Sequence, residues 1–124
     1  MKIDLNRMIQ TLKEHPDYSK MGMIASHLGV VRGNSLNGQE VIGIEVRYDQ
    51  NTIDKILSEI KGMPGIVDVL VEISTGHLSV GDDIMAVVVG GDTREHVFPA
   101  LMTAVNSIKK RGTKKKEFFN TLAI

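Results

Sequence analysis

The chain has 124 residues and a hydrophobic content of 42%, which predict one globular domain spanning residues 1–124. It contains no cysteine, which excludes disulfides, thiolate metal sites and cysteine nucleophiles, so any sulfur that it handles must be supplied by a partner. The net charge of zero and the aromatic content of 4% disfavour a general nucleic-acid binder, which uses a broad basic face and stacking aromatic rings.

The first half of the chain carries two helical and two strand patterns. Apolar residues at helical spacing predict a helix over 3–15 that ends at Pro16, and a second helix over 51–61. Residues 22–31 predict a strand, which we expect at the centre of a sheet. Strict alternation of side-chain character predicts another strand over 41–48.

The second half predicts two strands and a long helix. Residues 66–73 and 84–89 are rich in β-branched and apolar residues, as buried strands are. Asp92 is the expected N-cap of the last helix, with Glu95 as its capping-box partner, and Gly112 ends that helix. This order of elements predicts an α+β fold, with helices packed against a mostly antiparallel sheet.

A basic segment, residues 109–124, follows the last predicted helix. Six cations and no anion lie between Lys109 and Lys116. Lys109 falls at the helix end, where a cation is stabilised by the helix dipole. If it faced a pocket instead, desolvation would lower its pKa and make its amine a base or a nucleophile. The run from Lys114 to Lys116 is typical of a solvated face, although the pair Phe118 and Phe119 would anchor it to the domain.

Two arginines are placed where they could bind an anion. Arg32 lies where a predicted strand meets the turn-rich segment 33–40, and a guanidinium there can bind phosphate or carboxylate with paired hydrogen bonds. Arg94 lies in the first turn of the last helix, where free backbone N–H groups favour an anion and disfavour a cation. The alternatives are a solvated loop arginine at 32, and an exposed Arg94 that pairs with Asp92 or Glu95.

Several features of common functional sites are missing from the sequence. No two of the four histidines lie three or four residues apart, and phosphate-loop, dinucleotide and serine-elbow motifs are absent, so we expect no metal site and no cofactor. His27 is expected to be a buried histidine with satisfied hydrogen bonds. We expect a cytoplasmic protein, because no apolar run approaches the roughly 20 residues of a membrane helix and no secretory signal precedes the domain.

Four segments, in consistent order and similar spacing, resemble motifs of the large, catalytic subunit of molybdopterin synthase. Together they lie within a region of similarity that runs from about residue 3 to residue 117. The segments are Gly22-(six residues)-Gly29-Val30-Val31-Arg32, Gly76-x-Leu78-x-Val80-Gly81-Asp82, Arg94-x-x-x-Phe98-x-Ala100 with the later Ile108-Lys109, and Lys115-Lys116-Glu117.

The resemblance implies an α/β hammerhead-like fold, a homodimer and a heterotetramer with a small ubiquitin-like sulfur carrier at each end. The carrier would present a C-terminal thiocarboxylate, and its sulfur would be transferred to cyclic pyranopterin monophosphate to form molybdopterin. By position in the motifs, Lys109 is the leading catalytic lysine and Lys115 the second, although Lys114 and Lys116 compete for the latter role. The resemblance implies that Arg32 and Arg94 bind substrate, and we expect Lys116 to assist them.

Three functional hypotheses follow. The first is this sulfurtransferase. The second is a non-catalytic paralogue that acts as a dimeric binding or regulatory module. It is favoured by Thr93, which stands where the family has histidine, and by Ile73 and Ser74, which replace a histidine and an arginine. The third, a nucleic-acid binder that uses the lysine cluster, is opposed by the zero net charge and the few aromatic residues.

Overall fold

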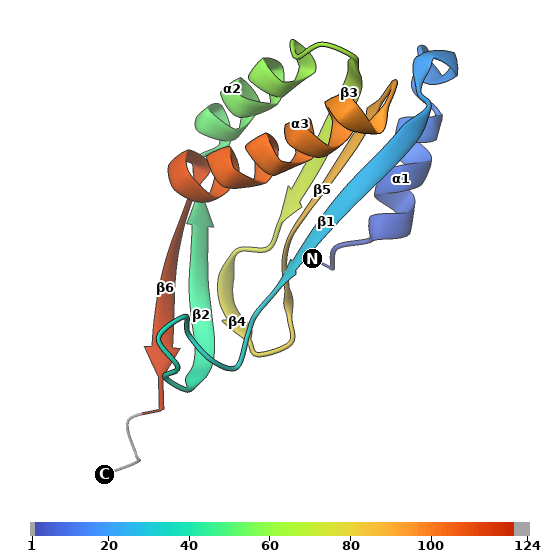
Figure 1. Cartoon of the computed structure of the whole chain (residues 1–124). Helices are drawn as coiled ribbons and strands as arrows, with labels where there is room; N and C mark the ends of the chain where they lie inside the picture. The colour runs from blue at the N-terminus through green and yellow to red at the C-terminus, as the bar shows by residue number, and fades with distance from the viewer. Residues whose placement is uncertain (1, 121–124) are drawn as a thin grey trace.

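The computed structural model describes residues 2–120 as three α-helices and two three-stranded antiparallel sheets (Figure 1). One sheet has the strand order β1-β5-β3 and the other β4-β2-β6. This architecture confirms the predicted α+β class. In chain order the elements are α1 (Leu5–Lys13), the 3-10 helix η1 (Tyr18–Lys20), β1 (Met23–Val30), β2 (Val41–Tyr48), α2 (Gln50–Lys61), β3 (Ile66–Ile73), β4 (Gly76–Ser79), β5 (Asp83–Gly91), α3 (Arg94–Ser107), the π-helix η2 (Ile108–Gly112) and β6 (Thr113–Phe119).

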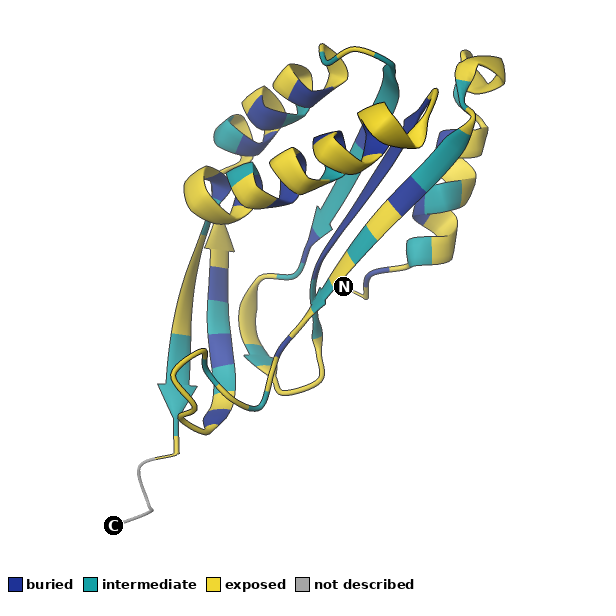
Figure 2. Ribbon diagram, in the orientation of Figure 1, coloured by how far each residue is buried: buried dark blue, intermediate teal, exposed yellow. Residues whose placement is uncertain are grey.

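The first sheet is covered on both faces by helices. Strand β5 lies at its centre, and residues Met85–Gly91 of that strand are all buried (Figure 2). Ala86 and Val88 pack with α1 on one face, while Val87 and Val89 join the larger core with α2 and α3 on the other. Because both faces of β5 are buried, both carry apolar side chains, and its sequence is a continuous apolar run.

Strand β1 is an edge strand, so the expectation that it lies at the centre of a sheet is wrong. It pairs only with β5 in the sheet, antiparallel, with His27 opposite Val87. Its residues Leu28 and Val30 are exposed, whereas Ile24, nearer the start of the strand, packs with α1. The apolar character of β1 reflects the helix α3 on its other face rather than two neighbouring strands.

The second sheet contains two strands that the sequence analysis did not predict. Strand β2 lies between the short β4 and the basic β6, and Val46 pairs with Gly76 on one side and Lys115 on the other. Three successive lysines conceal the alternation of β6, because lysines on the two faces of a strand look alike in sequence. The segment expected as a solvated run is therefore a paired strand, and Phe119, partly buried, packs against the core.

The first turn of α3 is arranged differently from the predicted capping box. Thr93 is the N-cap, and its side chain makes no capping hydrogen bond. Asp92 instead accepts hydrogen bonds from the Thr93 backbone N–H at 2.6 Å and pairs with His96 Nδ1 at 2.7 Å. The hydrogen bond from His96 is the largest cause that lowers the pKa of Asp92. Asp92 therefore lies one position before the N-cap, and its side chain pairs with the first turn of the helix.

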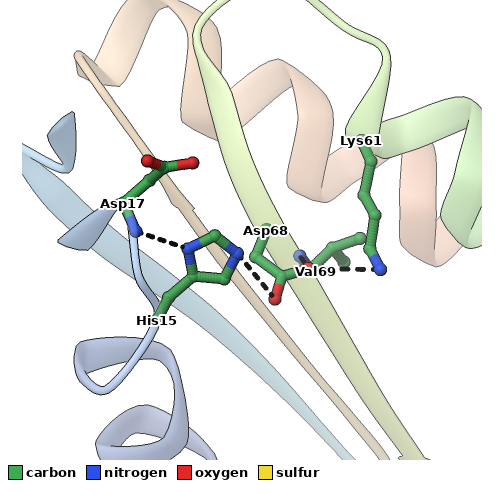
Figure 3. Close-up of polar contacts among 5 residues, drawn as sticks. All are labelled: His15, Asp17, Lys61, Asp68 and Val69. Carbon is green, nitrogen blue, oxygen red and sulfur yellow. Dashed lines mark hydrogen bonds and ion pairs between the residues drawn. The ribbon is translucent and has the colours of Figure 1, made fainter.

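A cluster around Asp68 joins α1, α2 and β3 (Figure 3). His15 Nδ1 accepts the Asp17 backbone N–H at 2.9 Å, so the ring hydrogen of the neutral form is on Nε2, which lies 3.8 Å from Asp68 Oδ2. The other carboxylate oxygen lies 3.4 Å from Lys61 Nζ and accepts the Val69 backbone N–H at 2.8 Å. One carboxylate thus connects the ends of two helices that cover opposite faces of the sheet.

Gly91 is expected to be sensitive to substitution, because it is closely packed near the start of α3. A Cβ there would lie 2.6 Å from the Gly65 carbonyl oxygen and 2.7 Å from Val97 Cγ2, and Val97 is fully buried. We therefore expect Gly91→Ala to lower the free energy of unfolding by about 3 kcal/mol through overpacking, measured by urea denaturation.

Gly62→Ala is the matched control. Gly62 is exposed, has a helical backbone, and a Cβ there would meet only ordinary contacts at 3.5 Å or more. Alanine at this site is expected to leave stability unchanged or raise it by about 0.5 kcal/mol, because it restricts the unfolded chain. Equal effects of the two substitutions would contradict the assigned packing around Gly91.

Within the described residues, no helix combines the length and the hydropathy that crossing a membrane requires. The longest of them, α3, has 14 residues and is interrupted by Pro99. Its fully buried residues Val97, Ala100 and Ala104 pack in the larger core, against the first sheet and α2. These contacts hold α3 against the core along its length. They therefore fix the position of its C-terminal end, where the basic segment begins.

Candidate functional site

A cavity of about 290 Å³ lies where the end of β1, the end of α3 and the strand β6 come together. Its volume is at the lower end of the range for small-molecule sites. Ile44, Ile84 and Met85 form part of an apolar floor. Its charged lining residues are Arg32, Lys109, Lys115 and Glu117. The two expected catalytic lysines and one expected substrate-binding arginine therefore line one cavity, although 83 residues of sequence separate the first from the last.

Lys109 reaches the cavity because the helix changes form at its end. The π-helical turn η2 begins with the fully buried Ile108, whose carbonyl accepts a hydrogen bond from Thr113 Oγ1 at 3.2 Å. Gly112 closes the turn, and there a Cβ would stand 2.5 Å from Ile53 Cδ1 of α2. Short π-helical turns change the direction of side chains and are frequent at functional sites. The turn thus fixes the backbone from which Lys109 extends.

Lys115 lines the cavity because of its position in β6. It lies opposite Val46, a buried residue of β2, and directly opposed residues of antiparallel strands share one face of the sheet. Its neighbours Lys114 and Lys116 lie opposite Arg47 and Glu45, so they belong to the other face. Strand alternation therefore places Lys115, but not Lys114 or Lys116, on the side of the cavity, and its catalytic role stays a prediction.

Arg32 follows an irregularity at the end of β1. The register against β5 shifts between Gly29 and Val30, and the buried Val31 exchanges backbone hydrogen bonds with the turn before β5. In these bonds the Val31 N–H donates to the Asp82 carbonyl and the Gly81 N–H donates to the Val31 carbonyl, both at 2.9 Å. The backbone next to Arg32 is thus held by the turn before β5, the strand that contributes Ile84 and Met85 to the cavity floor.

The cavity has an excess of positive charge. Three cations and one carboxylate line it, and among residues 2–120 no ion pair joins Arg32, Lys109 or Lys115 to a carboxylate. Arg111 differs, since it binds Glu59 through two hydrogen bonds at 3.0 and 3.3 Å, and this contact holds the pKa of Glu59 below its usual value. Three cations against the single carboxylate of Glu117 leave a net positive charge, which suits an anionic ligand.

Arg94 and Lys116, the other expected substrate-binding residues, lie elsewhere. Arg94 is 80% exposed, pairs with Glu95 at 3.2 Å, and lines a different hollow beside Gly22. It begins α3 whereas Lys109 follows the end of that helix, and the helical rise separates them by roughly 20 Å. Lys116 lies over the Phe118 ring, 5.5 Å from its centre, on the outer face of the second sheet.

His27 is a residue whose environment the sequence analysis misjudged. Its Nε2 atom is buried and has no hydrogen-bond partner within the described part of the chain, whereas a satisfied histidine was expected. Burial lowers the pKa of His27 below 6.5, and the positive charge of Lys109 lowers it further. The sequence offered one signal for this site, namely the position of His27 two residues before Gly29, which lines the cavity.

The lowered pKa predicts a pH dependence of stability. The unfolded chain takes up a proton on His27 near 6.5 and the folded chain only at lower pH, so this histidine contributes full stability above that value and progressively less below it. We expect the free energy of unfolding of the wild type, relative to that of His27→Phe, to fall between about pH 7.5 and about pH 5.5, as measured by urea denaturation. A constant difference over this interval would contradict a neutral, desolvated His27.

A larger hollow of about 770 Å³ lies at the other side of the β4–β5 turn, lined among others by Lys2, His77, Asp82 and Asp83. Its charges are mixed, and none of the expected catalytic or substrate-binding residues lines it, although Ile73, Ser74 and part of the motif at residues 76–82 do. Asp82 already serves its turn, since its carboxylate accepts the Ser79 backbone N–H at 2.8 Å. In residues 2–120, no three histidine or carboxylate side chains are grouped as metal ligands. The smaller cationic cavity is therefore the best candidate site.

Comparison with known proteins identifies the family of the chain. The model of the MoaE protein family matches residues 1–111. An uncharacterised protein of Methanocaldococcus jannaschii is 30% identical over 95 residues, which cover 73% of this chain and 80% of that protein.

Among solved structures, a molybdopterin biosynthesis MoaE protein from Burkholderia ambifaria is similar with a TM-score of 0.76 and 25% identity, over 97% of this chain and 82% of that one. Molybdopterin synthase from Staphylococcus aureus has the same fold, with a TM-score of 0.77 and 20% identity over 97% and 88% of the two chains. These likenesses support a role in molybdopterin biosynthesis. The chain belongs to the MoaE family, that of the large subunit of molybdopterin synthase.

Proposed function

We propose that this protein is a sulfurtransferase that transfers sulfur from the C-terminal thiocarboxylate of a small carrier protein to cyclic pyranopterin monophosphate, forming molybdopterin. The observation that carries the proposal is the meeting of Arg32, Lys109 and Lys115 in one cavity. Both reactants are anions, and the cavity offers three cations against one carboxylate, with no ion pair to these cations among residues 2–120. Such preorganised charge stabilises negative charge that develops during a reaction.

Each cation has a role that fits its chemistry. The planar Arg32 guanidinium can bind a phosphate or a carboxylate through two parallel hydrogen bonds. Lys109 extends from the rigid turn η2, so its amine can donate or accept a proton at a defined position. Lys115, which alternation directs to the same cavity, would stabilise the second anion while the two reactants are close together.

A carrier partner fits both the composition and a structural relative. The chain has no cysteine, so it cannot hold sulfur as its own persulfide and must receive it from outside. The complex of subunits 1 and 2 of molybdopterin-converting factor from Helicobacter pylori has a chain that is similar over 98% of this one, with a TM-score of 0.69 and 15% identity. We propose an analogous complex here, in which the carrier tail enters the cationic cavity.

The position of Arg94 bears on the proposed homodimer. Because Arg94 and Lys109 lie at opposite ends of α3, one chain cannot apply both to the same small ligand. If Arg94 contributes to binding, it does so from a second copy of the chain. Lys116, on the outer sheet face, would take part only through contact with the carrier.

The test is a reconstituted conversion assay. It combines the protein, a thiocarboxylated carrier from the same organism and cyclic pyranopterin monophosphate, and it measures dithiolene formation. Product that depends on both the protein and the thiocarboxylate is the expected result. A complex with the carrier that forms but gives no product would overturn the proposal.

That negative outcome would favour the second candidate, a dimeric binding or regulatory module. The observation in its favour is Thr93, which stands where the family has a histidine and caps α3 without a side-chain hydrogen bond. Calorimetry with the carrier and with the pterin would then show binding without turnover.

A further inference from the structure

The Nε2 atom of His27 is the one buried side-chain nitrogen or oxygen without a hydrogen-bond partner in residues 2–120. Buried polar atoms are nearly always paired, and leaving one unpaired costs on the order of 1–3 kcal/mol. Ala25, on the same face of β1, belongs to the apolar core and offers no hydrogen-bond donor. An unpaired group of this kind requires a reason, and its location provides one.

His27 stands directly behind the wall of the cationic cavity. Residues 27 and 29 of β1 lie on the same face of the strand, and Gly29 lines the cavity. A Cβ at Gly29 would lie 3.4 Å from His27 Nε2, so the nitrogen borders the space that a side chain at 29 would occupy. Because residue 29 is glycine, it places no side chain between the imidazole and the cavity.

The charged groups around the cavity favour a neutral imidazole. Lys109, at the end of α3, lies close enough for its charge to act on His27, in addition to the effect of burial. Arg32 after β1 and Lys115 on β6 are further cations of the cavity, and Glu117 is its one anion. A neutral imidazole keeps one ring nitrogen as an acceptor, and lysine has three N–H donors and no acceptor.

We propose that His27 is a positioning residue for Lys109: its unprotonated Nε2 accepts a hydrogen bond from the Lys109 amine group when that exposed side chain turns into the cavity. The remaining N–H donors of Lys109 then face the ligand. This satisfies the unpaired nitrogen and restricts a side chain that is otherwise free to rotate. The part of the proposal that concerns catalysis rests on the role given to Lys109 in the proposed function.

The direct test uses ¹⁵N-labelled full-length protein and does not depend on activity. Long-range ¹H–¹⁵N spectra would record the His27 ring nitrogens in the wild type, Lys109→Ala and Lys110→Ala, each alone and with inorganic phosphate as an anionic probe. We expect the Nε2 signal of the neutral ring to move in Lys109→Ala and to stay in place in Lys110→Ala. If only the titration midpoint moves, or if nothing moves in either condition, Lys109 does not donate to Nε2 and the proposal is overturned.

The kinetic test separates positioning from structural support. In the conversion assay we expect His27→Phe, which keeps an aromatic ring without an acceptor, to lower kcat by about 10- to 100-fold at unchanged KM. His27→Gln, which retains an acceptor oxygen, should recover much of that loss. Wild-type kcat in His27→Phe would overturn the proposal. If the wild type itself makes no product, the proposed function fails, and the spectra still decide whether His27 positions Lys109.

Discussion

Replacing Lys109 by alanine is expected to abolish molybdopterin formation and to leave the fold intact. The amine is the one group at the helix end that can both transfer a proton and stabilise negative charge in the cavity. Losing a positioned proton donor or acceptor costs about 10² to 10⁴ in rate, and losing a positioned charge adds to this. The measurement is single-turnover dithiolene formation with saturating carrier and pterin.

Lys110→Ala is the matched control for this substitution. Lys110 is the next residue of the same π-helical turn, is also exposed, and does not line the cavity. Its replacement should leave the rate near that of the wild type, and both variants should unfold within about 0.5 kcal/mol of it in urea. Turnover by Lys109→Ala at the wild-type rate would refute the lysine assignment even if the protein proves to be a synthase.

The fold was predictable where side-chain pattern and burial agree. Strands 41–48 and 66–73 were predicted with the bounds that the structure shows, since β2 alternates clearly and β3 is rich in β-branched residues. Strand β6 was missed because its inner residue Lys115 and its outer residues Lys114 and Lys116 are chemically identical. Only the pairing with β2 distinguishes them, and pairing between segments 70 residues apart leaves no local signal in the sequence.

The same limit applies to the site. The resemblance to a family named Lys109, Lys115 and Arg32, but it did not show that these residues meet in one cavity without carboxylate partners. Nor did it show that Arg94 lines a different hollow, at the end of α3 opposite to Lys109. A helical sequence pattern predicts the length of a helix, but it does not predict which cavity lies at each end. His27 was misjudged because burial and hydrogen-bond satisfaction are separate properties, and the sequence gives evidence only for the first.

Lys115→Ala is expected to lower the conversion rate by about 10²-fold, while Lys114→Ala and Lys116→Ala have little effect. The three lysines are consecutive and exposed, so sequence and solvent exposure do not separate them. They differ in the face of the sheet, since Lys115 lies opposite the buried Val46 and its neighbours lie opposite Arg47 and Glu45. Only Lys115 therefore reaches the cavity that contains Lys109.

This series tests the sheet and the site together, because each variant removes one positive charge from the same segment. A general electrostatic attraction of the carrier to the basic strand would make the three variants weaken binding alike, and the effect would fall as salt is added. If Lys115 has a specific role, Lys115→Ala lowers kcat. Added salt does not produce the same loss of kcat in the wild type, and Lys114→Ala and Lys116→Ala do not show it. Equal losses in all three variants would mean that β6 acts as a charged docking strand and that Lys109 works without a second lysine.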